Sequence, residues 1–394
     1  MKIIYLHQYF NTPEQGGSLR SYYIARAMVV AGHEVSLITT HNKKEYAKIN
    51  IEGFEVHYLP VIYRNGFSFW RRIHAFFNFA QASYKLAKKL PQHNLIYATS
   101  TPLTVGLTAL WLKKKLKIPY IFEVRDLWPL VPIRLGILRN PIAQWLTQRW
   151  EKKIYQNAQQ IIALSPAMQT HVQAIVPHKT VHLIPNMADA TLFSLPAPPK
   201  NESKERKKFI VAYLGTISYA NHLPYLVEIA RFCSLSHTLF EIEFWIVGKG
   251  AKLPEVQALS LAYQLENVRF FSYQNTYNIH TLMAQVDAVY VSFLNNPVLE
   301  STSPNKFFEA LGAGKLCIVN TKGWLRELVE THACGFYADP NAPESFLAQL
   351  TPFLENQALL ASYQQNAQIL AKKEFSVEVL TKKLMACIDL EISI

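Results

Sequence analysis

The stretch MKIIYLHQYFNTPEQGGSLRSYYIARAMVVAGHEVSLITT, residues 1–40, decides the fold class. Residues 2–6 form a short apolar run that predicts a buried strand, and a polar loop follows it. Apolar residues at helical spacing predict a helix over about 19–31, and Gly32 is placed to cap its end. Residues 34–40 form a second apolar run. This strand–helix–strand unit implies a parallel sheet in an α/β fold.

The same alternation continues along the chain and then restarts. Residues 194–208, SLPAPPKNESKERKK, are rich in proline and charge and predict a linker. We therefore expect two doubly wound α/β domains, over residues 1–190 and 191–370, and a last helix over roughly 356–391 whose end, 371–394, packs back on the first domain. Further strands are predicted at 95–98, 120–124, 160–164, 181–184, 209–214, 244–247, 268–271, 288–292, 317–319 and 335–337. Ligands of such folds bind at the carboxyl ends of the strands, so a cleft between two facing domains is the expected site.

The composition is that of a globular protein expected in the cytoplasm. Of the 394 residues half are apolar and 17% are charged, and the four cysteines show no metal-binding spacing, which predicts buried, reduced thiols. The N-terminus lacks the features of a signal peptide. Residues 95–112 carry no charge and have the length of a membrane span, but Thr99 to Pro102 interrupt them, which favours a strand followed by a helix over 103–117.

The net charge of +12 is concentrated in one half of the chain. Residues 1–190 hold 23 Lys+Arg against 9 Asp+Glu, whereas residues 191–394 hold 17 against 19. Within the basic half, residues 64–77 and 111–117 mix arginine or lysine with aromatic side chains. That mixture suits an anionic membrane surface, here the inner face of the cytoplasmic membrane. The alternative is a solvated basic face over core aromatic residues.

Two motifs follow predicted strands in the first half. Gly16 and Gly17 precede a helix, where backbone N–H groups can receive an anion, although an ordinary loop pair is the alternative. Glu123, Arg125 and Asp126 crowd the end of the strand YIFEV. Such a cluster is either used chemically or forms a structural ion pair of Arg125 with one of the two acids.

Two further motifs lie in the second half. Gly248 and Lys249 follow the strand FWIV and can approach a diphosphate, with a plain turn as the alternative. Residues 299–314, LESTSPNKFFEALGAG, predict a helix capped by Ser303, with Lys306 in its first turn. The carboxylates of Glu300 and Glu309 can each accept two hydrogen bonds from a vicinal diol.

Taken together, GGSLRSYYIARAMVVAGHEVSLIT, FEVRDLWP, IIALS with IPN, VGKG and SPNKFFEALGAGK resemble the retaining glycosyltransferases of family 4, with the GT-B fold. The resemblance covers nearly the whole chain and is greatest to enzymes that build bacterial surface polysaccharides, including lipopolysaccharide, from N-acetylated amino sugars. It implies transfer of a sugar from a nucleotide diphosphate, with UDP expected, to a lipid-linked or saccharide acceptor. No cofactor and no metal are expected.

The resemblance also implies roles for individual residues. Asp126 and Arg125 would lie near the reacting centre on the acceptor side, and Lys306 would meet the diphosphate. Glu309 would hold the ribose, and Glu300 would hold the sugar. The donor would also be bordered by Gly16, Gly17, Gly215, Gly248 and Lys249.

The sequence departs from the family pattern at two positions. The usual first acid of the paired-glutamate motif falls on Ser301, one residue after Glu300. Many relatives also carry a basic residue after the glycine that corresponds to Gly215, where this chain reads TISYANHLPY. Lys306, Lys249 or Lys252 and helix N-termini would then meet the charge of the leaving diphosphate.

Two other functions remain open on the sequence alone. A non-hydrolysing nucleotide-sugar 2-epimerase shares the fold class but needs no basic aromatic patch. A nucleic-acid-binding protein would account for the sequence pI of 9.3, yet no nucleic-acid-binding module is recognisable.

Overall fold

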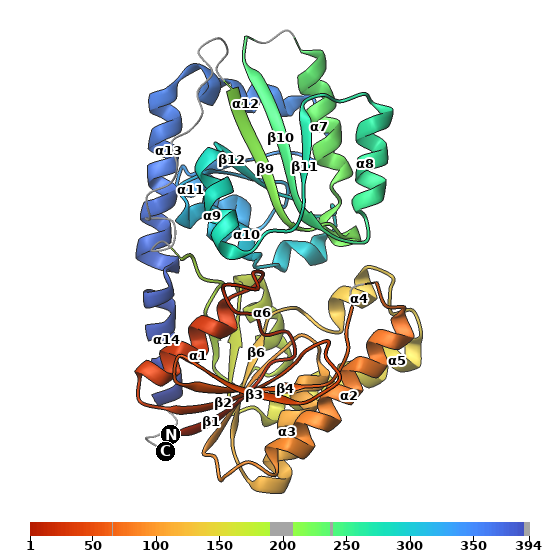
Figure 1. The fold of residues 1–394 in the computed structure, drawn as a ribbon, viewed down its shortest axis with the longest axis vertical. Coiled ribbons are helices and arrows are strands. Elements are labelled where there is room, and N and C mark those ends of the chain that lie inside the picture. The colour runs from red at the N-terminus through yellow and green to blue at the C-terminus, as the bar shows by residue number, and fades with distance from the viewer. Residues whose placement is uncertain (65, 190–207, 237–238, 390–394) are drawn as a thin grey trace. The chain divides into compact units, whose positions relative to one another are not determined.

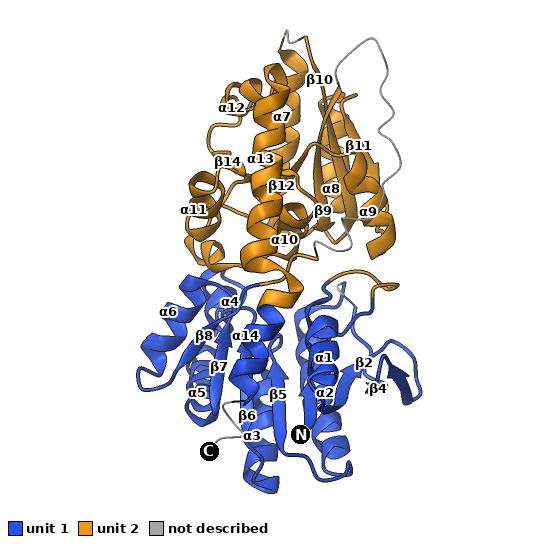
Figure 2. Cartoon of the chain, turned by 90° about the vertical axis from the view of Figure 1, so that its left-hand side faces the viewer, with its two compact units in different colours: residues 1–12, 18–185, 380–394 blue, residues 13–17, 186–379 orange. Residues whose placement is uncertain are grey.

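The structure is a computed structural model that describes residues 1–64, 66–189, 208–236 and 239–389 (Figure 1). The linker expected over 194–208 lies, except for Lys208, outside these residues. The chain forms two compact units (Figure 2). The first comprises residues 1–12, 18–185 and 380–394, and the second comprises residues 13–17 and 186–379.

The first unit contains an eight-stranded sheet with the order β3-β4-β2-β1-β5-β6-β7-β8. All neighbouring strands are parallel except β3 and β4. These two pair antiparallel, as strands joined by a tight turn do. The fold of the first domain predicted from residues 1–40 is confirmed. Its strands are β1 (Lys2–Leu6), β2 (Glu34–Thr40), β3 (Ala47–Ile51), β4 (Phe54–Leu59), β5 (Leu95–Thr99), β6 (Tyr120–Val124), β7 (Gln160–Ala163) and β8 (Val181–Leu183).

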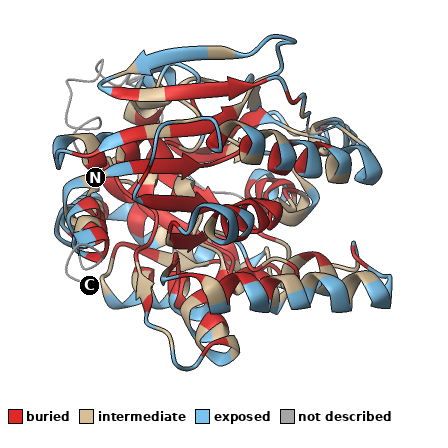
Figure 3. Ribbon diagram, turned by 90° about the horizontal axis from the view of Figure 1, so that it is seen from below, coloured by how far each residue is buried: buried red, intermediate tan, exposed pale blue. Residues whose placement is uncertain are grey.

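Helices cover both faces of this sheet, because each strand that is buried on both faces needs apolar partners on both sides. The interior strands are buried along their whole length: every residue of β5 and β6 is buried, as the red strands of Figure 3 illustrate. The helices are α1 (Arg20–Val30), α2 (Phe69–Ala87), α3 (Thr104–Leu116), α4 (Leu130–Arg134), α5 (Pro141–Asn157) and α6 (Pro166–Ile175).

The uncharged stretch 95–112 divides into β5 and the start of α3, as the sequence predicts. Within the described residues, no helix combines the length and the apolar character needed to cross a membrane.

The second unit contains a six-stranded parallel sheet with the order β11-β10-β9-β12-β13-β14. Its core is formed by apolar residues of β9, β10 and β12 packed on α7 and α12. The strands are β9 (Lys208–Thr216), β10 (Glu241–Lys249), β11 (Val268–Phe271), β12 (Ala288–Val291), β13 (Leu316–Val319) and β14 (Gly335–Tyr337). The helices are α7 (Pro224–Leu235), α8 (Leu253–Ala262), α9 (Thr276–Gln285), α10 (Asn305–Gly312), α11 (Trp324–Thr331), α12 (Ser345–Glu355) and α13 (Gln357–Leu370).

The single helix expected over 356–391 is wrong. After α13 the chain makes a π-helical turn, Ala371–Phe375, and then an extended residue, Ser376, before α14 (Val377–Asp389) begins. Ser376 breaks the helix because its hydroxyl accepts a hydrogen bond from the Val379 N–H and caps α14. The return of this last helix to the first unit is confirmed, since Gln160 Nε2 donates to the carbonyl of Cys387.

Candidate functional site

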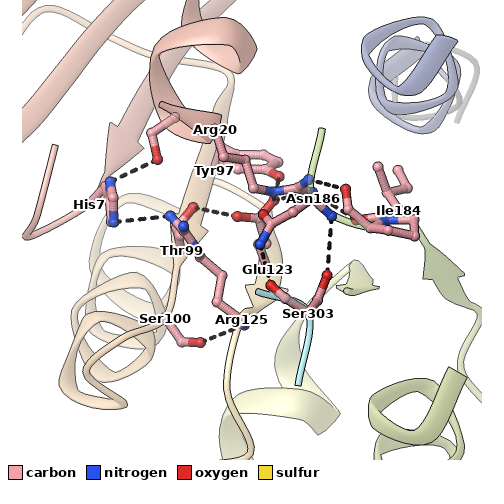
Figure 4. Close-up of polar contacts among 12 residues, drawn as sticks. His7, Arg20, Tyr97, Thr99, Ser100, Glu123, Arg125, Ile184, Asn186 and Ser303 are labelled. Atoms are coloured by element: carbon pink, nitrogen blue, oxygen red, sulfur yellow. Dashed lines mark hydrogen bonds and ion pairs between the residues drawn. The ribbon is translucent and has the colours of Figure 1, made fainter. Parts of the chain in front are cut away.

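In the first unit, the end of β6 carries a buried ion pair. The side chain of Glu123 is inaccessible to solvent and accepts hydrogen bonds from Arg20 Nε at 3.0 Å and from Tyr97 OH at 2.6 Å (Figure 4). Arg20 also donates to the carbonyl of Ile184, at 3.0 Å. Burial alone would raise the pKa of Glu123, but the charges of Arg20 and Arg125 and these hydrogen bonds outweigh it and lower the pKa. Glu123 is therefore an ionised structural residue that joins α1 and β6.

Arg125 does not form the structural ion pair that the sequence left open. In the described part of the chain it has no carboxylate within ion-pair distance, and its Nη2 donates to Ser18 Oγ at 2.6 Å. Its Nη1 lies 3.4 Å from His7 Nε2. Ser100 Oγ fixes the backbone here by accepting from the Arg125 N–H at 3.0 Å. The guanidinium is thus oriented by neutral groups, while its charge acts on Glu123 and Asp126 without an ion-pair contact in the described part of the chain.

His7 belongs to this cluster, although sequence reasoning missed it. It directly follows β1, and its Nδ1 lies 2.8 Å from Ser21 Oγ. Since Arg125 can only donate, His7 Nε2 accepts and Nδ1 carries the proton. Burial, followed by the charge of Arg125, lowers the pKa of His7 well below its usual value, so the ring is neutral at pH 7. The available signal was a polar residue at the carboxyl end of a predicted strand.

Asp126 is exposed and stands beside this network. Its Oδ2 accepts a hydrogen bond from Thr101 Oγ1 at 2.8 Å. Asp126, Arg125 and His7 therefore place a carboxylate, a guanidinium and a neutral imidazole at the carboxyl ends of β1 and β6.

In the second unit, Lys306 lies in the first turn of α10. Its Nζ donates to Tyr213 OH at 2.7 Å, and Tyr213 in turn donates to the carbonyl of Thr216 at 2.6 Å. The Lys306 side chain passes close to Gly215, where an added Cβ would lie 3.5 Å from Lys306 Cε. The lysine is thereby held at the end of β9.

Lys306 and Glu309, one helical turn apart, perturb each other's ionisation. Burial lowers the pKa of Lys306 to about 7, against the attraction of Glu309. Burial raises the pKa of Glu309 to about 7, against the attraction of Lys306. Both side chains are half-buried. Two neighbouring groups of α10 whose pKa values are shifted toward neutrality are typical of a functional site.

Tyr273 connects this pair to Lys249 and to the glycine loop. Its ring lies under the Lys249 ammonium, 3.9 Å from the ring centroid, and its hydroxyl donates to the carbonyl of Gln15 at 3.0 Å. A Cβ on Gly16 would lie 2.9 Å from that hydroxyl, and Gly16 has a φ of +70°, so glycine is required there. Burial raises the pKa of Tyr273, and the negative charge of the nearby Glu309 raises it further. Tyr273 was not among the residues that the sequence singled out.

Close packing explains the glycine at position 248 of the VGKG motif. A Cβ on Gly248 would lie 1.9 Å from the carbonyl oxygen of Gly215, because β9 and β10 approach closely at their ends. Lys249 pairs in register with Thr216, the first residue of the segment TISYANHLPY that follows Gly215. Lys252 instead forms an ion pair with Glu255.

The predicted cap of α10 is wrong. The helix begins at Asn305 with Pro304 as its N-cap residue and no side-chain cap. The hydroxyl of Ser303 instead accepts a hydrogen bond from the Asn186 N–H at 3.3 Å, and Asn186 also donates through its side chain to the Ser303 carbonyl (Figure 4).

Glu300 lies in a short 3₁₀ helix, Pro297–Ser301, before α10. Its Oε2 lies 3.7 Å from the position of a Cβ on Gly323, at the start of α11. Among the described residues, no ion pair joins Glu300 to Lys306. Ser301 is buried, and its hydroxyl donates to the carbonyl of Val298 at 2.8 Å. The serine therefore completes the 3₁₀ turn at the position of the usual acid.

Residues 69–77 and 111–116 of the two basic aromatic segments lie on α2 and α3 of the first unit. Trp70 is 77% exposed, whereas Phe76 is buried and stacks on Tyr63 with ring centroids 5.8 Å apart. Trp111 packs edge-on against Tyr84, with ring centroids 6.1 Å apart. Part of each segment thus belongs to the domain's own packing.

Two family models match successive parts of the chain. Residues 15–187 match the family described as "Glycosyl transferase 4-like domain", and residues 197–369 match "Glycosyl transferases group 1". No curated protein sequence matched the chain.

Several solved structures share the fold over almost their full length. Sucrose-phosphate synthase from Thermosynechococcus elongatus is 16% identical, with a TM-score of 0.77, and 100% of this chain and 99% of that chain are covered. HepE from Anabaena, solved with UDP-glucose, is 18% identical with a TM-score of 0.67, and 99% of each chain is covered.

WaaG, a glycosyltransferase involved in lipopolysaccharide biosynthesis, is 15% identical with a TM-score of 0.65, and 97% of this chain and 98% of that chain are covered. The two matched domains follow each other in this chain as two parallel-sheet α/β units. The chain therefore belongs to the glycosyltransferases of family 4, with the GT-B fold.

Proposed function

We propose that this protein is a retaining glycosyltransferase that transfers an N-acetylated amino sugar from UDP to a lipid-linked or saccharide acceptor in bacterial surface-polysaccharide biosynthesis. The observation that carries the proposal is the arrangement of Lys306, Glu309, Tyr273 and Lys249 in the second unit. It offers two cations to a diphosphate and a carboxylate to a diol.

Lys306 and Lys249 stabilise the leaving diphosphate in this proposal. The difficult step is departure of the nucleotide while the anomeric carbon becomes cationic, and fixed positive groups lower that barrier. An arriving diphosphate drives Lys306 to its charged form, because an opposite charge raises the pKa of a buried lysine. The two lysines then supply the charge that a metal ion supplies elsewhere.

Glu309 binds the ribose, and Glu300 contacts the transferred sugar. Gly16, Gly17, Gly215 and Gly248 border the donor with backbone atoms, since glycine allows close approach. Asp126 and Arg125 serve the acceptor side of the reaction, and His7 orients Arg125. The sugar is attacked on the face from which the diphosphate leaves, with a donor phosphate oxygen taking the proton of the acceptor hydroxyl.

The choice of UDP is supported by two solved structures of the same fold. HepE was solved with UDP-glucose, and an Escherichia coli trehalose-6-phosphate protein was solved with UDP-2-fluoro glucose. The bacterial surface context is supported by WaaG. We further propose attachment to the inner face of the cytoplasmic membrane through residues 64–77 and 111–117, of which Trp70 is the most exposed aromatic residue.

A thermal-shift screen of UDP-, GDP- and ADP-sugars tests the donor. We expect UDP-N-acetylhexosamines to raise the melting temperature most, because bound ligand stabilises the folded state in proportion to its affinity. Nuclear magnetic resonance of the product then tests retention of the anomeric configuration. A larger shift with GDP- or ADP-sugars, or an inverted product, would overturn the corresponding part of the proposal.

A further inference from the structure

The first half of α5, which lies beside α2 in Figure 1, leaves most of its surface exposed to solvent. The helix runs from Pro141 to Asn157, but its buried residues, Glu151, Ile154 and Tyr155, all lie in its last two turns. None of residues 141–150 is buried. A helix normally forms in a globular protein because one face packs on the core, so the apolar side chains of this half need another explanation.

The exposed half presents a regular apolar stripe. Ile142 is 73% exposed, Trp145 55% and Leu146 38%. With Arg149 they stand at positions i, i+3, i+4 and i+7, which is the spacing of one helical face. Single exposed apolar residues are ordinary on protein surfaces, but a stripe of this kind marks an interaction site.

The charges around the stripe select its partner. The Arg149 guanidinium lies over the Trp145 ring, 4.8 Å from its centroid, and Lys152 and Lys153 are exposed on the next turn. Glu151 is the one acidic residue of α5, and it is buried and accepts a hydrogen bond from Tyr155. The surface of this helix is therefore apolar and cationic with no exposed carboxylate.

The neighbouring helices α2 and α3 are also rich in aromatic and basic residues. Phe77 of α2 packs edge-on against Trp150 of α5, with ring centroids 6.0 Å apart. Neither α2 nor α3 contains an acidic residue. Tryptophan beside arginine and lysine, without acids, is the composition that binds the headgroup region of an anionic bilayer.

We propose that the stripe Ile142, Trp145, Leu146 and Arg149 on α5 is a membrane-binding surface that inserts into the interface of an anionic bilayer. The inference rests on the proposed function only in that a lipid-linked acceptor explains why the enzyme meets a membrane. Helix α5 lies outside both basic aromatic segments. Besides Trp70, it supplies the most exposed apolar side chains of this surface.

Vesicle co-sedimentation of the full chain tests the inference. The probes are phosphatidylcholine vesicles with and without phosphatidylglycerol, and the test variant is Ile142→Ser/Trp145→Ser. The matched control is Leu261→Ser on α8, which removes an isolated apolar side chain that is 79% exposed. We expect the double variant to lose about tenfold or more of its partitioning to the anionic vesicles, and the control to bind as the wild type does.

Two readouts separate the possible failures. Wild-type partitioning of the double variant would overturn the inference, and so would a change in its oligomeric state by size-exclusion chromatography, which would assign the stripe to a protein partner. UDP binding by calorimetry is measured on the same samples and should be equal in all of them. Absence of UDP binding in the wild type would contradict the proposed donor, whereas the vesicle result would stand.

Discussion

The Lys306 ammonium donates a hydrogen bond to the Tyr213 hydroxyl at 2.7 Å, although the two residues are 93 positions apart in the chain. The hydroxyl is committed on its other side, since it donates to the Thr216 carbonyl. Tyr213 therefore fixes both the position of the lysine and the direction of the hydrogen bond between them. This contact connects the end of β9 to the first turn of α10.

Replacing Tyr213 with phenylalanine removes the hydroxyl that accepts the hydrogen bond of Lys306. The half-buried ammonium is then left without this partner. We expect a loss of about 1 kcal/mol in the free energy of unfolding, together with weaker binding of a UDP-sugar above pH 7. Chemical denaturation measures the first effect and calorimetry the second. If Tyr213→Phe and the wild type bind a UDP-sugar equally well from about pH 6.5 to about pH 8.5, Tyr213 does not position the lysine.

Donor binding should depend on pH through Lys306. Its pKa is lowered to about 7, so the free enzyme loses this proton as the pH rises past neutrality. The bound diphosphate requires the ammonium, and affinity should therefore fall by up to about tenfold per pH unit above 7. A UDP-sugar is the suitable probe because its diphosphate diester does not titrate in this range. The variant Lys306→Met should bind weakly and show no alkaline decline.

The acidic side of the pH profile of donor binding should depend on Glu309. Its pKa is raised to about 7, so the carboxyl group is protonated below neutrality and accepts hydrogen bonds from a diol less well. We expect affinity to fall on the acid side as well, and Glu309→Gln to abolish that decline. A flat profile between pH 6 and pH 8, roughly one unit on each side of the two pKa values, would contradict both assignments.

Lys249 and Lys252 form a matched pair of lysines with different surroundings. Lys249 lies on the Tyr273 ring, opposite Thr216, whereas Lys252 is paired with Glu255. We expect Lys249→Gln to weaken UDP-sugar binding by about tenfold, since a charge-assisted hydrogen bond to a phosphate is worth roughly 1.5 kcal/mol. Lys252→Gln should bind as the wild type does. If the two variants behave alike, Lys249 is not the second cation.

The buried pair of Arg20 and Glu123 should matter for stability. Removing one partner leaves a charge buried, so Arg20→Met should cost about 3–5 kcal/mol in the free energy of unfolding, and Arg20→Met/Glu123→Leu should cost less. The exposed pair of Arg326 and Glu330 is the control, and Arg326→Met should cost less than about 1 kcal/mol. Urea denaturation of the three variants and the wild type checks the order.

Local pattern predicted twelve of the fourteen described strands, because these are short apolar runs closed by a polar or glycine residue. It missed β3 and β4, because β3 is largely exposed and Glu55 and His57 interrupt the apolar residues of β4. Residues 95–99 and 120–124 are entirely buried, as continuous apolar strands of a parallel sheet should be. The break at Ser376 could also have been seen, since a serine before Val-Glu is a common helix start. It was missed because the apolar period continues on both sides of it.

The candidate site was only partly predictable. Lys306 and Glu309 are one helical turn apart, so sequence alone places them together. Tyr213, in β9, and Tyr273, in the loop after β11, lie more than 30 residues away from them in the chain, and no local pattern records their proximity. Ser303 was misjudged for the same reason, because its partner Asn186 is 117 residues distant.

The central claim is that the second unit binds the nucleotide sugar through Glu309 and Lys306 and that Asp126 acts in the transfer. Steady-state kinetics of Glu309→Gln and Asp126→Asn with a UDP-sugar test it most directly. We predict that Glu309→Gln raises the donor KM by about tenfold or more, whereas Asp126→Asn lowers kcat by about a hundredfold with little change in donor KM. Wild-type donor KM in Glu309→Gln, together with wild-type kcat in Asp126→Asn, would contradict the account.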